Sequence, residues 1–432
     1  MQRPTKLLNR NFFLLWQGQS ISRLGIQAFE IAMLFWIKHA TDSATLMGLM
    51  LMLSNLPGIV LGPIGGTVAD RYSRRAIILV SEALNGVAVL SLAALLFVAP
   101  DSTDTILIWL FIVSFFGAIV SSFFNPAMSA AIPDLVPEAR VATANSLSQS
   151  TAQVAVFLGQ GIGGTLFRLL GAPVLFLING LTYLVSAACV LFIRIPQGIP
   201  DDTGDRQKQN STFRVDLMNG FRYVWDTRGL RELVLISAFL NFFTVPIIVL
   251  LPFYVEDFLK VSVDWYGFLL AAYGGGTMLG YLLAGVIRLE GKVRSRVVVG
   301  MILLEAIGYG LLGLVDNPFT AVALALLGGC VGGFVGILIT TLLQLTTPGD
   351  VRGRVFGFLA TIAASLTPIA MGMTGVIADA LDQNIPLIYV GCGAVLLILS
   401  ILVSIRCEFR NFLAFETEHH ADIKIAGYQS ID

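Results

Sequence analysis

Residues 65–78, GGTVADRYSRRAII, place four charged side chains within six positions: Asp70, Arg71, Arg74 and Arg75. The rest of the chain is apolar, because 56% of its 432 residues are hydrophobic, 13% are charged, and the mean hydropathy is +0.81. This composition is typical of membrane proteins and not of soluble domains. The charged segment therefore predicts a short loop between two membrane spans.

Runs long enough to cross a bilayer follow one another along the chain. A first span at 11–37 contains two charges, Arg23 and Glu30. The later runs, of which 297–315 contains one glutamate, are 43–69, 83–100, 105–133, 141–167, 169–193, 233–255, 265–287, 297–315, 317–349, 355–378 and 383–405. We predict an all-α polytopic membrane protein with twelve transmembrane helices in two pseudo-symmetric six-helix bundles.

The basic residues predict the orientation of these spans. All but four of the 27 Lys and Arg residues fall on one side of the predicted membrane. Lys38, Arg168 and Lys260 fall on the other side, and Arg23 lies inside a span. Because Lys and Arg accumulate in short cytoplasmic loops, we expect both termini to be cytoplasmic.

Hydrophobicity falls sharply between the sixth and seventh spans, which predicts a cytoplasmic linker. Apolar residues recur within it at helical spacing, as in an amphipathic helix that lies on the membrane or packs on the bundles. The expected units are an N-terminal bundle at 1–195, the linker at 196–230, a C-terminal bundle at 231–408 and a cytoplasmic tail at 409–432.

The two halves resemble each other at an offset of 219 residues. This offset pairs Gly48 with Gly267, Gly66 with Gly285, and Arg75 with Arg294. The repeat indicates a duplicated six-helix unit. Because six is even, both copies begin on the same side of the membrane and the halves are parallel.

The charged loop has the pattern Gly66-x-x-x-Asp70-Arg71-x-x-Arg74-Arg75. This pattern resembles the loop signature of the major facilitator superfamily, a family of secondary transporters. A degenerate copy, AGVIRLEGKVRSR, stands in the second half of the chain. The resemblance covers the whole chain, since the twelve predicted spans and the central linker also match.

In that family, the acid and bases of this loop bridge to neighbouring helix ends and lock the outward-facing state. The resemblance implies that Asp70 meets the start of the eleventh span, near 354–358, because a carboxylate suits a helix N-terminus. Asp134 and Arg140 are expected in the same charged network. Alternatively the loop charges are topology markers, which accounts for the arginines but not for Asp70.

Three segments resemble the macrolide-efflux and enterobactin-exporter branch of the superfamily: 14–37, 56–71 and 122–147. This resemblance implies export in exchange for protons. In the fifth span, the run GQGIGG is similar to an antiporter signature, with Gln160 in place of a proline. Its glycines, Gly159, Gly163 and Gly164, allow close approach of helices.

Ionisable residues inside a span need a reason, since insertion scales assign about 2.5–3.5 kcal/mol to a charge at the bilayer centre. Arg23 and Glu30 lie seven residues apart, so they share a helix face at a separation of about 10 Å. Glu30 is a candidate carrier of the coupling proton, and Arg23 a candidate partner for an anionic group. Alternatively the two form a fixed structural pair. Glu305 is a third proton-coupling candidate, although the resemblance places its span at the bundle periphery.

The family pattern also implies where a substrate cavity lies, because spans one, four, seven and ten line the path in the resembling proteins. The cavity candidates that follow are Gln27, Asn125, Asn241 and Gln344. Two of them stand near prolines, where a helix can bend. The alternative is that these polar side chains only hold helices together.

The chain contains no phosphate-binding loop, serine-hydrolase elbow or zinc-protease helix motif. Its four cysteines and three histidines show no ligand spacing. We therefore expect no enzyme activity, no cofactor, no metal site and no nucleic-acid partner.

Together these features predict a monomeric secondary active transporter in a bacterial cytoplasmic membrane. It is expected to export an amphipathic small molecule, such as a drug or siderophore, by alternating access, with protons as the coupling ion. The alternatives are a facilitator, a lipid or lysolipid transporter of the same fold, and a non-transporting receptor.

Overall fold

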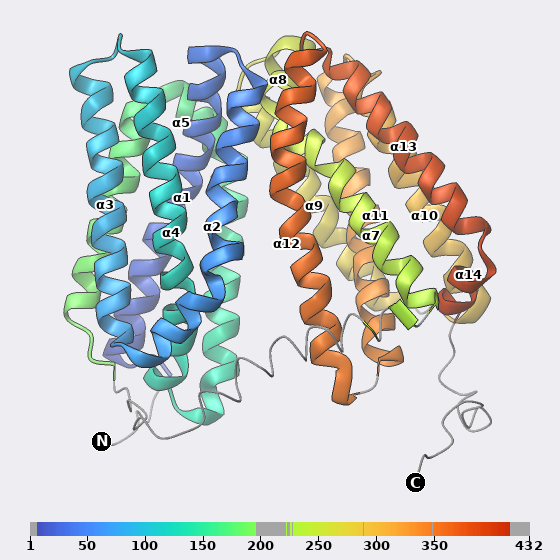
Figure 1. The fold of residues 1–432 in the computed structure, drawn as a ribbon, viewed down its shortest axis with the longest axis horizontal. Coiled ribbons are helices and arrows are strands. Elements are labelled where there is room, and N and C mark those ends of the chain that lie inside the picture. The colour runs from blue at the N-terminus through green and yellow to red at the C-terminus, as the bar shows by residue number, and fades with distance from the viewer. Residues whose placement is uncertain are drawn as a thin grey trace.

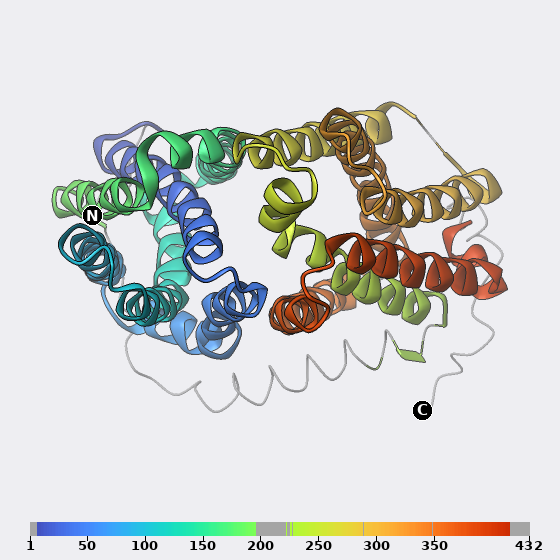
Figure 2. The same cartoon turned by 90° about the horizontal axis from the view of Figure 1, so that it is seen from above.

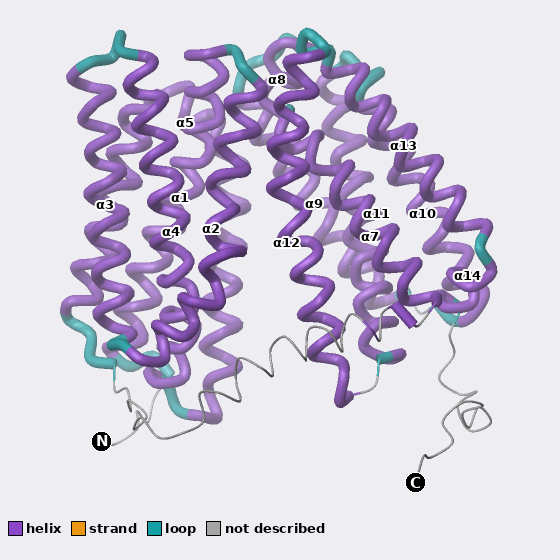
Figure 3. The backbone as a smooth tube through the Cα atoms, viewed as in Figure 1, coloured by secondary structure: helices purple, strands orange, loops and turns teal. Residues whose placement is uncertain are grey.

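The structure is a computed structural model that describes residues 7–195, 222, 225–226, 228–287, 289–347 and 349–414. Within these residues, all regular structure is helical (Figures 1 and 3). The N-terminal half contains α1 (Arg10–Thr41), α2 (Ala44–Arg71), α3 (Arg74–Val98), α4 (Thr103–Leu135), η1 (Glu138–Arg140) and α5 (Val141–Leu191). The C-terminal half contains α7 (Arg228–Val249), α8 (Leu251–Phe253), η2 (Tyr254–Phe258), α9 (Asp264–Val286), α10 (Gly291–Leu312), α11 (Pro318–Thr346), α12 (Gly349–Ala380), α13 (Ile385–Ile405) and α14 (Cys407–Leu413).

Helix α5 is 51 residues long because it joins two helices across a break. Gly171 adopts φ 72° and ψ 167° there, a backbone conformation that suits glycine, and Pro173 follows two positions later. The two arms of α5 are the predicted fifth and sixth spans. With α5 counted twice, the helices α1–α4, α7 and α9–α13 complete twelve crossings in the described part of the chain. The predicted all-α, twelve-helix fold is confirmed.

Polar side chains fix where several spans begin. Asn9 accepts the N–H of Phe12 at 3.0 Å at the start of α1. Ser43 and Ser73 cap α2 and α3 in the same way. Such caps satisfy backbone donors that an apolar helix leaves free at its first turn, so each helix starts at a polar residue.

The helices α1–α5 form one bundle, and α7–α14 form a second bundle beside it (Figures 1 and 2). The two bundles approach each other at one end and diverge toward the other end, where α1 begins and α14 ends (Figure 1). We call these the closed end and the open end. The largest buried cluster contains residues of both bundles, such as Phe35, Met47 and Phe253, whereas two smaller clusters each lie within one bundle.

One contact is repeated at matched positions of the two halves. Arg75 donates to the carbonyls of Val190 and Leu191, at 3.3 and 2.6 Å, where α5 ends. Arg294, its partner at the offset of 219 residues, donates to the carbonyl of Leu413 at 2.8 Å, at the end of α14. Each arginine thus ties the third span of its half to the last helix of that half, as a duplicated unit would.

Most of the predicted linker at 196–230 lies outside the described residues, together with the amphipathic helix expected in it. The same holds for 415–432 of the predicted tail. The start of that tail, from residue 409, is the C-terminal part of α14.

Candidate functional site

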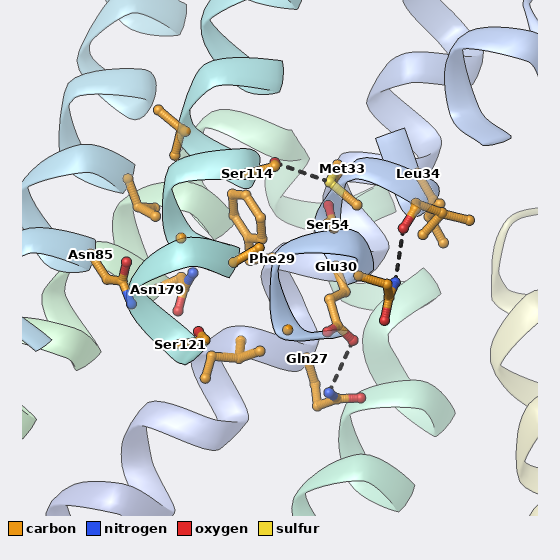
Figure 4. Close-up of a pocket in the computed structure, with 18 of the residues that line it drawn as sticks. Gln27, Phe29, Glu30, Met33, Leu34, Ser54, Asn85, Ser114, Ser121 and Asn179 are labelled. Atoms are coloured by element: carbon orange, nitrogen blue, oxygen red, sulfur yellow. Dashed lines mark hydrogen bonds between the residues drawn. The ribbon is translucent and has the colours of Figure 1, made fainter. Parts of the chain in front are cut away.

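A cavity of about 630 Å³ lies between the helices of the N-terminal bundle (Figure 4). Its wall comes almost entirely from α1 to α5. Of the described residues that line it, three belong to the C-terminal half: Ile248, Tyr266 and Met371. The cavity is therefore strongly asymmetric, although the two bundles have equivalent folds.

Glu30 is the one charged residue among the described residues of the cavity wall. It lies one turn after Gln27 on α1, and Gln27 Nε2 donates to its carboxylate at 3.1 Å (Figure 4). No cation pairs with it in the described part of the chain. Around it the wall is mixed, with apolar Phe29 and Met33 beside serine and asparagine side chains (Figure 4). Such a wall can hold an apolar body, and the carboxylate can bind a proton or a cationic group.

Arg23 lies on the same helix but not in this cavity. It lines a separate small pocket with α1, α4 and α5 residues that include Gln19, Met128 and Thr151. Among the described residues, it forms neither a hydrogen bond nor an ion pair, so the structural pair with Glu30 is not formed here. The seven-residue spacing gives the two side chains a similar direction but different surroundings.

Whether a predicted cavity residue lines the cavity depends on the half of the chain that contains it. Gln27 and Asn125 line the cavity. Asn241 does not, and instead accepts a hydrogen bond from the Thr367 hydroxyl at 3.1 Å, between α7 and α12. Gln344 is exposed on α11, away from the cavity wall. The structure thus joins the two N-terminal candidates and leaves out the two C-terminal ones.

Glu305 lies within the C-terminal bundle and not on its outer surface. The Tyr309 hydroxyl donates to it at 2.9 Å, and Gly332 of α11 lies beside the carboxylate. It has no contact with the cavity in the N-terminal bundle.

Several cavity residues were not expected from the sequence. They are Ser54, Asn55, Asn85, Ser114, Ser121, Ser122, Asn179, Tyr183 and Tyr266. Their signal was a polar residue in the middle of an otherwise apolar run. Six of them lie in spans two, three, six and eight, which the family pattern did not assign to the path.

The glycine run of α5 lies between the cavity and the bundle interface. Gly159 and Gly163 pack against Gln27 and Ile31 of α1, and Gln160 faces the cavity. Gly164 packs across the interface against the carbonyl of Val263, next to α9. A Cβ atom at Gly164 would collide with that backbone, so the run permits the close approach of the two bundles.

Ion pairs between the bundles hold the closed end. Lys38 of α1 contacts Glu256 at 3.0 Å and Asp257 at 2.9 Å. His39 contacts Glu256 at 3.0 Å. Burial acts to raise the pKa of Glu256, but hydrogen bonds with His39 and Lys38 outweigh it and the pKa lies below its ordinary value. These two cross-bundle contacts therefore stabilise the charged form of Glu256.

A further ion pair and a helix cap complete this closure. Arg168 of α5 contacts Asp264 at the start of α9 at 2.9 Å. Asp379, near the end of α12, accepts the N–H groups of Ala44 and Thr45 at 2.9 and 2.8 Å. It also accepts the Ser43 hydroxyl at 2.7 Å. A carboxylate of one bundle thus caps the first turn of α2 in the other bundle.

The charged loop lies at the open end and bonds within its own bundle. Arg74 contacts Asp134 at 2.6 Å and Asp70 at 3.8 Å. Asp70 is 71% exposed. Arg71 and Arg140 are also exposed, and neither side chain bonds to another described residue.

The expected contact of Asp70 with the start of α12 is not made in this state. The backbone of 354–358 is helical, whereas the side chains of Arg354, Gly357 and Phe358 lie outside the described residues. Gly66 has open space beside it, and its neighbour Gly65 packs against the carbonyl of Ser122 instead. The contact stays a prediction for a state in which the open end closes.

The fold and the cavity can now be set beside known proteins. A sequence profile described as Major Facilitator Superfamily matches residues 15–371. The chain belongs to the major facilitator superfamily. Membership of this superfamily makes it a polytopic membrane transporter and not an enzyme.

Two relatives in the superfamily are efflux proteins by name. Macrolide efflux protein A of Streptococcus pyogenes is 25% identical over 382 residues, which cover 86% of this chain and 90% of that protein. Multidrug efflux pump Tap of Mycolicibacterium fortuitum is 25% identical over 383 residues, which cover 85% and 90%.

A solved structure shares the superfamily fold. It is a bacterial homolog of the human lysosomal transporter Spinster in an inward-facing and unoccupied conformation, with a TM-score of 0.66 and 17% identity. The match covers 95% of this chain and 97% of that one.

Proposed function

We propose that this chain is a secondary active transporter that exports an amphipathic small molecule in exchange for protons. The observation that carries the proposal is a mixed apolar and polar cavity with one carboxylate, Glu30. The two bundles around it are joined by ion pairs and hydrogen bonds at the closed end and are apart at the open end. The names of its efflux relatives support the direction of transport.

The open end faces the cytoplasm in this proposal. It carries the charged loop at 70–75 and the chain termini, and the positive-inside bias places both on the cytoplasmic side. Two of the three basic residues predicted outside, Lys38 and Arg168, form cross-bundle ion pairs at the closed end. A pairing role explains why these cations occur on the side where basic residues are rare. The state is therefore inward-facing, in a bacterial cytoplasmic membrane.

Glu30 couples the substrate to the proton. As the single charge in the cavity, it binds either a proton or a cationic substrate group, but not both. A substrate that enters from the cytoplasm displaces the proton from Glu30, and this proton leaves to the cytoplasm. After release of the substrate outside, Glu30 takes up a proton from that side. One proton then moves inward for each substrate that moves outward.

The two ends exchange their closures during the cycle. In the inward-facing state Asp379 caps α2. When the open end closes, Asp70 caps the start of α12 in the same manner. Because α2 and α12 run in opposite directions, a single rocking motion breaks one cap and forms the other.

The cavity also suggests the charge of the substrate. Its wall contains an acid and, among the described residues, no base. Arg23 lies in a different pocket. A cationic or neutral amphipathic molecule fits this wall better than an anionic one, because an anion would meet the Glu30 carboxylate unpaired.

Proteoliposomes loaded with a pH-sensitive dye test the proposal. We would add cationic, neutral and anionic amphipathic compounds under a proton gradient to wild type, to Glu30→Gln, and to the control Glu408→Gln. Glu408 is an exposed acid on α14, far from the cavity. We expect substrate-dependent proton movement in wild type and the control, and none in Glu30→Gln. Substrate flux without proton movement in wild type would reject antiport and leave a facilitator.

A further inference from the structure

A second carboxylate, Glu82 on α3, lies inside the N-terminal bundle next to the cavity wall. Its side chain is 2% exposed. Gln19 Nε2 donates to one carboxylate oxygen at 2.6 Å, and the Ser22 hydroxyl donates to the other at 3.4 Å. Gln19 also donates to Ser186 at 3.1 Å. One polar network therefore joins α1, α3 and α5 at Glu82, and the transport mechanism above does not use it.

No cation pairs with Glu82 in the part of the chain that the structure describes. The other titratable groups on the helices around it are Arg10, Arg23, Glu30, Lys38 and His39 on α1, Asp70 and Arg71 on α2, Arg74 and Arg75 on α3, Asp104 and Asp134 on α4, and Arg168, Tyr183 and Cys189 on α5. A buried carboxylate with neutral donors alone is costly in its charged form, and protonation removes that cost. A glutamine would satisfy the packing without this cost. The site is therefore suited to hold a proton.

Two asparagines lie between Glu82 and the cavity. Asn85 follows one turn later on α3, and Asn179 lies opposite on α5, where Gly86 packs against the carbonyl of Gly180. Both amides line the cavity (Figure 4). Their Oδ1 atoms are buried and accept no hydrogen bond from any described residue. Buried acceptors of this kind suit a water molecule or a hydronium ion that donates to them.

Tyr183 completes the connection to the cavity. It lies one turn after Asn179 on α5 and lines the cavity wall. Its side chain lies within electrostatic range of both Glu82 and Glu30. A phenol hydroxyl can accept a hydrogen bond from one group while it donates a hydrogen bond to another.

We propose that Glu82 is a second proton-binding site that exchanges protons with Glu30 through Tyr183 and the two asparagines. The inference rests on the proton coupling proposed above and extends it to a residue outside the cavity. When the Glu82 acid gives up its proton, Gln19 and Ser22 stabilise the carboxylate that remains, and the Glu30 carboxylate becomes an acid. One proton moves, and the total charge of the two groups is unchanged. Glu82 thus holds a proton while a cationic substrate occupies Glu30.

Infrared spectroscopy of the reconstituted full chain, without substrate, tests the site directly. The carbonyl stretch of protonated carboxyl groups would be followed through a pH titration in wild type, Glu82→Gln, Glu30→Gln and Glu408→Gln. We expect one component of the signal at neutral pH to be removed by Glu82→Gln and retained in Glu30→Gln and Glu408→Gln, and a second component, from protonated Glu30, to be removed by Glu30→Gln alone. A spectrum of Glu82→Gln that keeps every wild-type component would overturn the proposal. Because no transport is measured, this result is independent of whether antiport itself is correct.

Tyr183→Phe tests the path and leaves Glu82 with its donors in place. We expect the Glu82 signal to persist and its exchange with D2O to slow by about tenfold, because a positioned proton-transfer group is lost. An unchanged exchange rate would contradict the path. In transport assays, Glu82→Gln should keep one proton per substrate but move both about tenfold more slowly, because Glu30 then takes up its proton without a neighbouring donor. An unchanged transport rate would contradict the coupling role.

Discussion

The two ends of the α2 and α12 pair use equivalent aspartates differently. Asp379, the penultimate residue of α12, accepts three hydrogen bonds from the start of α2. Asp70, the penultimate residue of α2, is 71% exposed and reaches Arg74 of its own bundle at 3.8 Å. Since the helices run in opposite directions, each aspartate lies where the other helix begins. The comparison indicates that one type of cap exists at both ends and is formed at one end at a time.

Two pairs of spin labels would follow these ends separately. Asp101 and Asp316 are exposed at the closed end on opposite bundles, and Ala139 and Lys292 are exposed at the open end. Cysteines at these positions, in a chain without its own four cysteines, report the closed-end and open-end distances.

The largest effect is expected for Gly164→Ala. The new Cβ would meet the carbonyl of Val263 across the bundle interface, and overpacking of this kind costs about 1–3 kcal/mol. The closed-end distance should lengthen in most molecules. Gly66→Ala is the matched control, because Gly66 has open space beside it in this state. An unchanged closed-end distance in Gly164→Ala would refute the tight contact.

A smaller effect is expected for Asp379→Ala. It leaves the N–H groups of Ala44 and Thr45 without their acceptor, and loss of such a cap costs about 1–2 kcal/mol. The ratio of outward-facing to inward-facing molecules should rise by about tenfold. Spin-label distances measure this ratio. If this ratio stays at the wild-type value, Asp379 does not hold this end closed.

Asp70→Asn should act in the opposite sense and more weakly. Because Asp70 does not contact the other bundle here, the inward-facing state itself should be unaffected. Loss of a charge at a helix N-terminus should lower the outward-facing population by about threefold and slow transport. Membrane insertion should be normal, as measured by the amount of protein in the membrane fraction. Wild-type transport in Asp70→Asn would leave the loop with a topology role alone.

A lower pH on the side of the membrane that the closed end faces should weaken the contacts of that end slightly. The pKa of Glu256 is lowered from 4.5, so its ion pairs stabilise this end fully above pH 4.5 and are lost as pH falls through the lowered value. Lys38, His39 and Asp257 face the same group. The equilibrium that the closed-end distance reports should shift by a small free energy, about 0.5 kcal/mol. Glu256→Gln should remove this acid dependence, and an identical acid response in that variant would assign the effect elsewhere.

The spans could be predicted from the sequence because most of them are uncharged runs and charged segments separate one run from the next. The position of Glu82 inside a helix could not be predicted in this way. It lies 12 residues after Asp70, and a search for uncharged runs placed it with the loop charges, whereas α3 begins at Arg74. Two full helical turns separate Glu82 from that start. A charge near a predicted boundary is ambiguous until the helix start is known, and the Ser73 cap supplies that information.

The cavity was predictable on one side only. Gln27, Glu30 and Asn125 line it, whereas Asn241 and Gln344, chosen by the same family pattern, do not. Sequence symmetry treats the halves as equal, but the cavity depends on side-chain size and on which end of the molecule is open. Asp379 directly follows the predicted span at 355–378. Its contact with α2 joins residues more than 330 positions apart, which no local pattern reveals.

The most direct test of alternating access follows both label pairs in one sample as substrate and a proton gradient are added. We predict that the closed-end distance lengthens while the open-end distance shortens, and that Glu30→Gln prevents the response to protons. Distances that change together, or that respond to protons equally in Glu30→Gln, would contradict alternating access coupled through Glu30.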